Sequence, residues 1–236
     1  MKTIFITGSS RGLGLEFTKQ YLELGNQVIA SCRKPEKAKN LHDLKKLFPN
    51  TLTIIQLDVT KENERERVFG QIKKAFGSID ILINNAGIIS GDGKNIYNLG
   101  DVHKEDFMKI LQINSLAPLL MNEKFLPLLE KGTNSKIINM SSQNGSITQR
   151  TQGGKYSYCT SKAALNMITK ILSNDLREKE ITILSIQPGW IKTDMGGPEA
   201  PLEPKEPISK IIKLVESIGI TDTGKFLTQE GKELPW

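Results

Sequence analysis

The regular alternation of short apolar runs with helix-patterned segments is the feature that most constrains the fold of this chain. The apolar runs are rich in Ile, Leu and Val, and they span residues 2–7, 27–32, 52–57, 79–83, 136–140, 181–186 and 225–228. Between them lie amphipathic segments over residues 13–24, 35–48, 61–76, 104–131, 156–179 and 208–217. A strand followed by a helix, repeated along a chain, is typical of a parallel sheet with helices packed on both faces.

The apolar runs are continuous rather than alternating, as expected for parallel strands buried on both faces. The chain of 236 residues shows no internal boundary, repeat or low-complexity segment. Its length suits one domain with a full-sized core. We therefore predict a single α/β domain over residues 1–236, a doubly wound Rossmann fold with about seven parallel strands.

Composition excludes several classes of protein. Hydrophobic residues make up 38% and charged residues 25%, and no apolar run reaches the length of a membrane span. Cys32 and Cys159 are too few for a disulfide framework, and His42 and His103 are isolated. The net charge of +6 is spread over lysines interleaved with acids. We predict a cytoplasmic protein without metal, membrane or nucleic-acid partner; part of the charge could serve an anionic cofactor.

A glycine-rich turn separates the first apolar run from the first helical segment. It reads Thr-Gly-Ser-Ser-Arg-Gly-Leu-Gly over residues 7–14. Gly8 permits a tight turn, Gly12 allows backbone to approach a pyrophosphate, and Gly14 allows the helix to pack on the sheet. A turn without a ligand is the alternative, which the position after the first strand disfavours. The predicted phosphate-binding residues are Gly8, Ser10, Arg11, Gly12, Leu13 and Gly14.

Tyr158 and Lys162 are four residues apart in a helical segment, so both side chains lie on one face. A cation beside a phenol favours the ionised phenol, which suits proton transfer near neutral pH. The pair alone is a weak signal. Tyr156 is the neighbouring candidate, but Thr160, not a lysine, lies four residues beyond it.

Together these motifs resemble the short-chain dehydrogenase/reductase family. The glycines are spaced Gly-x-x-x-Gly-x-Gly after Thr7, and Tyr158-x-x-x-Lys162 follows downstream. The other matches arrive in the family's order: Asn-Asn-Ala-Gly at 84–87, Asn114, Ser142, Pro188, Gly189 and Thr193. The resemblance covers essentially the whole chain. Segments 143–157, 188–198 and 231–236 look like the C-factor and sniffer-type carbonyl reductase branch.

The resemblance implies a role for each of four residues. Tyr158 protonates the substrate carbonyl oxygen as hydride arrives from nicotinamide, and Lys162 lowers the pKa of Tyr158 and binds the ribose. Ser142 orients the substrate oxygen, with Ser141 as its rival. Asn114, at a local break in its helix, holds a relay water; it could instead be a helix-interior Asn bonded to backbone. Tyr158 is also an implied cofactor contact, and the remaining ones are Asn85, Ala86, Gly87, Pro188, Gly189, Ile191 and Thr193.

The end of the second apolar run bears on which dinucleotide binds. NAD enzymes often carry an acid there, but this run ends in Cys32 and Arg33. Arg33, with Arg11, can bind a 2′-phosphate, which favours NADP(H) over NAD unless both are merely solvated charges. Asp58 and Val59 resemble the family's adenine-binding pair, although Asp58 could instead cap the helix near Lys61.

The function implied is NADPH-dependent reduction of a small-molecule ketone or aldehyde. Relatives pair through helices such as those at 104–131 and 156–179, which implies a homodimer or homotetramer. The long segment 143–157 should reshape the substrate mouth, and candidate wall residues are Ile88, Ile89, Ile147, Trp190 and Met195. Two alternatives stay open: a dinucleotide-binding signalling protein with incidental turnover, and a methyltransferase, which would not need Tyr158, Lys162 and Asn114 together.

Overall fold

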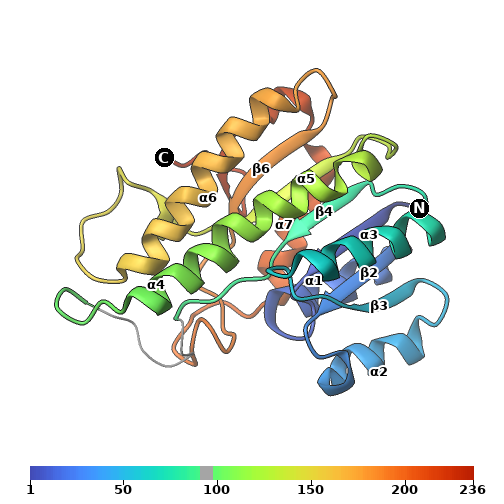
Figure 1. The fold of residues 1–236 in the computed structure, drawn as a ribbon, viewed down its shortest axis with the longest axis horizontal. Coiled ribbons are helices and arrows are strands. Elements are labelled where there is room, and N and C mark those ends of the chain that lie inside the picture. The colour runs from blue at the N-terminus through green and yellow to red at the C-terminus, as the bar shows by residue number, and fades with distance from the viewer. Residues whose placement is uncertain (91–97) are drawn as a thin grey trace.

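One sheet of seven parallel strands forms the centre of the protein, in a computed structural model that describes residues 1–90 and 98–236 (Figure 1). The strand order is β3-β2-β1-β4-β5-β6-β7. The strands are β1 (Thr3–Thr7), β2 (Gln27–Cys32), β3 (Leu52–Gln56), β4 (Ile81–Asn84), β5 (Lys136–Met140), β6 (Thr182–Gln187) and β7 (Phe226–Thr228). Each coincides with a predicted apolar run, so the predicted fold class is confirmed.

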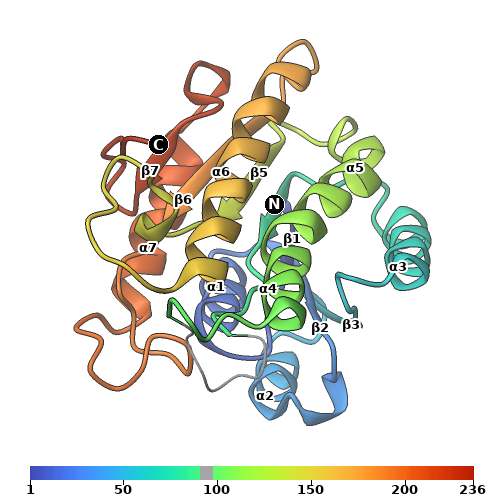
Figure 2. The same cartoon turned by 60° about the vertical axis from the view of Figure 1, so that its left-hand side comes forward.

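Helices cover both faces of the sheet (Figures 1 and 2). They are α1 (Gly12–Glu23), α2 (Lys39–Leu47), α3 (Glu62–Ala75), α4 (Lys104–Leu111), α5 (Ala117–Leu129), α6 (Tyr156–Asp175) and α7 (Lys205–Ser217). One hydrophobic core lies between the sheet and helices α1, α2 and α7. A second, separate core lies between the sheet and helices α3 and α5, and residues at the end of α6 contribute to it. This arrangement is the doubly wound architecture predicted from the alternation.

Strand β1 shows how the sequence produces two cores. Ile4 and Ile6 pack with Phe17 of α1, whereas Phe5 between them packs against Phe125 of α5 with ring centroids 5.0 Å apart. All five side chains named here, with Tyr21, are fully buried. Successive residues of a strand point to opposite faces, so an unbroken apolar run supplies both cores at once.

The predicted single helix over residues 104–131 is wrong in one respect. A π-helical segment, Gln112–Leu116, separates α4 from α5. Pro118 has no N–H, so the carbonyl of Asn114, four residues earlier, has no α-helical donor. The local break expected at Asn114 is therefore present. The segment at 35–48 is also split, into a 3₁₀ turn at Pro35–Lys37 and α2.

The strand order places a crevice at the carboxyl edge of the sheet. From β1 the chain moves outward to β2 and β3, and it then returns to β4 on the other side of β1. The loops after β1 and β4 consequently diverge, which leaves space between them. Ligands of open α/β sheets bind at such a switch point.

Candidate active site

A cavity of about 800 Å³ opens at this edge of the sheet. It is bordered by the turn after β1, the ends of β2, β3 and β5, the loop after β4, the first turn of α6 and the loop after β6. Its lining includes Gly8, Ser10, Arg11, Gly12, Leu13, Arg33, Asp58, Val59, Asn85, Ala86, Gly87, Ser142, Tyr158, Lys162, Pro188, Gly189, Ile191 and Thr193. Every predicted site residue is therefore in the lining except Gly14 and Asn114.

The glycine turn is held tightly against the loop after β4. Gly8 has a φ of 71°, and a Cβ there would lie 2.9 Å from the Cα of Ala86. A Cβ on Gly14 would lie 2.3 Å from the carbonyl oxygen of Gly8. The Asn85 side-chain amide donates to the carbonyls of Thr7 (2.9 Å) and Gly8 (3.1 Å). Gly14 thus shapes the turn by close packing, and the turn leaves backbone accessible to a phosphate group.

Tyr158 lies at the cavity wall in the first turn of α6, with 8% of its surface exposed. Tyr156 is 38% exposed and is not in the cavity lining. The Ser142 hydroxyl is a hydrogen-bond partner of the Tyr158 phenol. The rival Ser141 donates its hydroxyl to the buried side-chain oxygen of Asn166 at 2.7 Å. The geometry thus supports Tyr158 and Ser142 over their neighbours.

Lys162 is buried below Tyr158, and its ammonium donates to the carbonyl of Met140 at 2.7 Å. Nζ lies 5.8 Å from the centroid of the Tyr158 ring. Burial lowers the pKa of Lys162 to about 8. Burial also raises the pKa of Tyr158, and the hydrogen bond to Ser142 opposes this rise without cancelling it. The prediction that the pKa of Tyr158 is lowered is therefore wrong, because its pKa is raised in the structure. Tyr158 keeps its proton at neutral pH, as a general acid must.

The low pKa of Lys162 predicts how stability depends on pH in the cofactor-free protein. Folded Lys162 loses its proton near pH 8, whereas an unfolded lysine keeps it to about pH 10.4. Unfolding takes up a proton between these values, so the free energy of unfolding rises with pH. From pH 7 to 9 we expect the wild type to gain about 1 kcal/mol relative to Lys162→Met, measured by urea unfolding. Parallel pH profiles of the two proteins would contradict this expectation.

Asn114 connects the loop after β4 to α6. Its Oδ1 accepts from the backbone N–H of Ile88 at 2.9 Å. Its Nδ2 donates to the Ile88 carbonyl at 2.8 Å and to the Ser161 hydroxyl at 3.0 Å. The Asn114 side chain therefore positions the cavity wall. It is bonded to backbone, as one of the two alternatives expected, but that backbone belongs to Ile88, in a segment distant in the sequence. The relay water at the Asn114 carbonyl stays a prediction.

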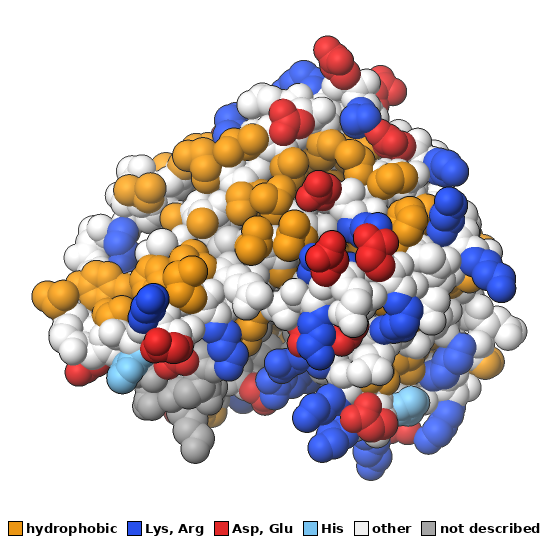
Figure 3. All heavy atoms as spheres, in the orientation of Figure 1, with side chains coloured by type: hydrophobic (Ala, Val, Ile, Leu, Met, Phe, Trp, Pro, Cys, Tyr) orange, Lys and Arg blue, Asp and Glu red, His pale blue; other side chains and the backbone are white. Residues whose placement is uncertain are grey.

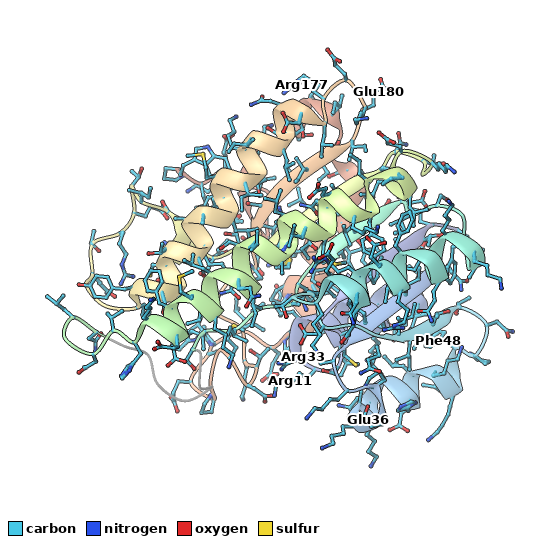
Figure 4. All side chains as sticks on the ribbon, viewed as in Figure 1. Arg11, Arg33, Glu36, Phe48, Arg177 and Glu180 are labelled. Carbon is cyan, nitrogen blue, oxygen red and sulfur yellow. The ribbon has the colours of Figure 1, made fainter. Side chains whose placement is uncertain are left out.

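Positive side chains gather at the end of the cavity beside the glycine turn, where Arg11 and Arg33 lie (Figures 3 and 4). Arg11 Nη1 lies 2.7 Å from Asp194 Oδ2, which links the glycine turn to the loop after β6. Both side chains of this pair are about 70% exposed (71% and 70%), so it contributes little stability and leaves Arg11 available to a ligand.

Asp58 lines the cavity, and it also holds its own turn. Its Oδ1 accepts from the backbone N–H and the hydroxyl of Thr60 at 3.0 and 2.7 Å. The residue before α3 is Lys61, so Asp58 stabilises the turn rather than capping the helix directly. Its contact with adenine stays a prediction.

Segment 143–157 shapes the far side of the cavity. Of the candidate wall residues, Ile88, Ile89, Trp190 and Met195 line the cavity, but Ile147 is 78% exposed and lies outside the lining. The Ser146 hydroxyl donates to the carbonyls of Pro235 (2.7 Å) and Trp236 (3.1 Å). The sequence motifs missed Lys109, Gln112 and Lys155, which also line the cavity and belong to no family motif.

Within residues 1–90 and 98–236, no helix combines the length and apolar character needed to cross a membrane. In the same part of the chain, no three His, Cys, Asp or Glu side chains are grouped so that they could hold a metal ion.

Known proteins of similar sequence and structure identify the family of this chain. The model of the short chain dehydrogenase family matches residues 2–203, so the chain belongs to that family of oxidoreductases. Its structure is similar to the carbonyl reductase Sniffer of D. melanogaster, with a TM-score of 0.94, 35% identity and full coverage of both chains. It is also similar to the NADPH-bound carbonyl reductase from chicken fatty liver, with a TM-score of 0.93 and 33% identity, over 100% of this chain and 99% of that one.

The C-signal of Myxococcus xanthus is 36% identical over 161 residues, which cover 68% of this chain and 94% of that protein. The predicted likeness to both the sniffer-type and C-factor branch is thereby confirmed.

Proposed function

We propose that this protein is an NADPH-dependent carbonyl reductase that converts a ketone or aldehyde to an alcohol. The observation that carries the proposal is the buried phenol of Tyr158, which keeps its proton beside Ser142 and Lys162 in a cavity continuous with the glycine turn. The two similar structures named above are carbonyl reductases, and one of them holds NADPH.

The residues present fit a dinucleotide. The glycine turn offers backbone without obstructing side chains, and Arg11 and Arg33 lie beside it in the lining. NADPH, when bound, supplies the hydride. Arg33 and Arg11 then hold the 2′-phosphate, and Lys162 holds the nicotinamide ribose.

Proton transfer to the substrate oxygen is the work of Tyr158. Ser142 donates a hydrogen bond that orients the carbonyl, and Tyr158 transfers its proton as negative charge develops on the oxygen. Lys162, whose ammonium is close to the Tyr158 ring, stabilises the resulting phenolate. The Asn114 carbonyl, which lacks an α-helical donor, can accept from a water that returns the proton.

The cofactor preference has a direct test in Arg33→Ala. A charge-assisted hydrogen bond is worth about 1.5–3 kcal/mol, so NADPH should bind roughly 10- to 100-fold more weakly to the variant. NADH has no 2′-phosphate, and its affinity should change less than about threefold. Fluorescence enhancement on titration measures both. Equal or tighter binding of NADH by the wild type would contradict NADPH dependence.

A dinucleotide-binding signalling protein with incidental turnover is the second candidate, favoured by the similarity to the C-signal. The two candidates differ in whether a cellular effect needs turnover. A phenotype of the wild type that persists in Tyr158→Phe would favour signalling.

We also propose a homodimer or homotetramer. The exposed side chains of Met108, Leu116, Met167 and Ile171 lie on α4, the π-helical segment and α6, where Figure 3 shows apolar side chains gathered. Cytoplasmic localisation, the single-domain boundary at residues 1–236 and the lack of a nucleic-acid partner stay predictions from the sequence.

A further inference from the structure

The backbone at the end of segment 143–157 holds a lysine in an unfavourable conformation. Lys155 has φ 55° and ψ 32°, in the left-handed region, directly after Gly154 at φ 75°. A residue with a Cβ is disfavoured in this conformation, whereas glycine adopts it without steric strain. Among the non-glycine residues with positive φ in the described chain, Asn134 and Glu180 are outside the cavity lining, whereas Lys155 is part of it.

Hydrogen bonds fix this backbone relative to the catalytic hydroxyl. Arg150 Nη2 donates to the carbonyls of Gly153 (2.7 Å) and Gly154 (2.9 Å), and its Nη1 donates to Asn144 Oδ1 (3.0 Å). The backbone N–H of Asn144 donates in turn to Ser142 Oγ at 3.2 Å. A continuous chain of contacts therefore connects Ser142 to the residue before Lys155.

No carboxylate pairs with Lys155 in the part of the chain that the structure describes, although its charge opposes the rise that burial causes in the pKa of the Cys159 thiol. The Lys155 side chain makes neither a hydrogen bond nor an ion pair within residues 1–90 and 98–236, although it is partly buried. Lys155 is the residue before α6, whose first turn contains Tyr158, and both residues line the cavity.

The carboxylates in the cavity lining are engaged elsewhere. Asp58 lies after β3 and holds the turn at Thr60, and Asp194 is paired with Arg11 at the glycine turn. A second lysine, Lys109 of α4, also lines the cavity. Among the described residues of the lining, neither acidic side chain is placed to neutralise Lys155.

We propose that Lys155 binds an anionic group of the substrate, so that the preferred substrates are carbonyl compounds bearing a carboxylate. The inference rests on the proposed carbonyl reductase function and specifies its substrate class. A partly buried ammonium attracts a carboxylate more strongly than one in bulk water. Because its backbone is fixed with respect to Ser142, the same contact would orient the carbonyl toward Tyr158.

The test compares two aldehydes that differ in charge and little in shape, 4-carboxybenzaldehyde and 4-carbamoylbenzaldehyde. We expect the wild type with NADPH to reduce 4-carboxybenzaldehyde with a kcat/KM about tenfold higher than that for 4-carbamoylbenzaldehyde. The difference should lie mainly in KM, because the proposed contact changes the affinity for the substrate. Lys155→Gly and Lys155→Gln should abolish the preference while retaining reduction of the amide. Lys155→Gly also suits the left-handed backbone, so lost folding would not explain the result.

Lys170→Gln is the matched control, since Lys170 is an exposed lysine of the same helix outside the cavity lining. It should keep the wild-type preference. No preference in the wild type, or a preference that survives Lys155→Gly, would overturn the inference.

A separate outcome would count against the proposed function. If neither aldehyde is reduced, the carbonyl reductase proposal fails, and calorimetric titration with benzoate then decides the inference by itself. Benzoate binding to the wild type that Lys155→Gly removes would support the anion site. Absent binding, or equal binding to both proteins, would overturn it.

Discussion

Tyr158→Phe should lower the kcat of NADPH-dependent carbonyl reduction by roughly 10²- to 10⁴-fold, the range that a general acid contributes. The change removes one hydroxyl, which carries the transferable proton and the hydrogen bond to Ser142. It leaves the aromatic ring in its place, so affinity for NADPH should stay within about threefold of the wild type. Steady-state kinetics measures the first effect and NADPH fluorescence titration the second.

Tyr156→Phe is the matched control for this experiment. Tyr156 begins the same helix but is 38% exposed and outside the cavity lining. Its variant should retain wild-type activity. A Tyr158→Phe protein that keeps more than about a tenth of the activity would remove Tyr158 from the acid role, because general acids contribute at least ~10²-fold.

Gly14→Ala should strongly destabilise the fold. The added Cβ would lie 2.3 Å from the carbonyl oxygen of Gly8 and 2.5 Å from Nδ2 of Asn85. The nearest atom belongs to backbone in the turn after β1, which cannot move without losing its contacts with the loop after β4. We expect the free energy of unfolding to fall by about 3 kcal/mol or more, measured by urea denaturation.

Gly70→Ala provides the comparison, because Gly70 also lies within a helix, α3, and an added Cβ would meet no described atom within 4 Å beyond its chain neighbours and the nearby backbone of that helix. Alanine is the better helix former, so this variant should gain about 0.5–1 kcal/mol. A Gly14→Ala protein as stable as the wild type would show that the turn can widen, and would weaken the assignment of Gly14 as a packing residue.

The elements that local patterns specify were predictable from the sequence. The seven strands follow from unbroken apolar runs, and the facing of Tyr158 and Lys162 follows from the geometry of one helical turn. The break at Asn114 is also local in origin, because Pro118 four residues later removes a donor. The break expected at Asn114 within residues 104–131 is the π-helical segment Gln112–Leu116.

Contacts between segments distant in the sequence were not predictable in this way. The pairing of Arg11 with Asp194, the engagement of Ser141 by Asn166 and the contact of Ser146 with Trp236 each depend on where two separate loops or helices meet. The pKa of Tyr158 is a further case, since burial raises it more than the Ser142 hydrogen bond lowers it. Burial is a property of the packed molecule and has no counterpart in residue spacing.

The individual strands, the glycine turn and the facing of Tyr158 and Lys162 follow from the sequence alone, since each depends on residues close together in the chain. The place of Lys155 in the cavity wall depends on how distant segments pack. Its left-handed backbone is held by Arg150 through loop carbonyls, and its charge matters because folding places it in the wall that contains Tyr158.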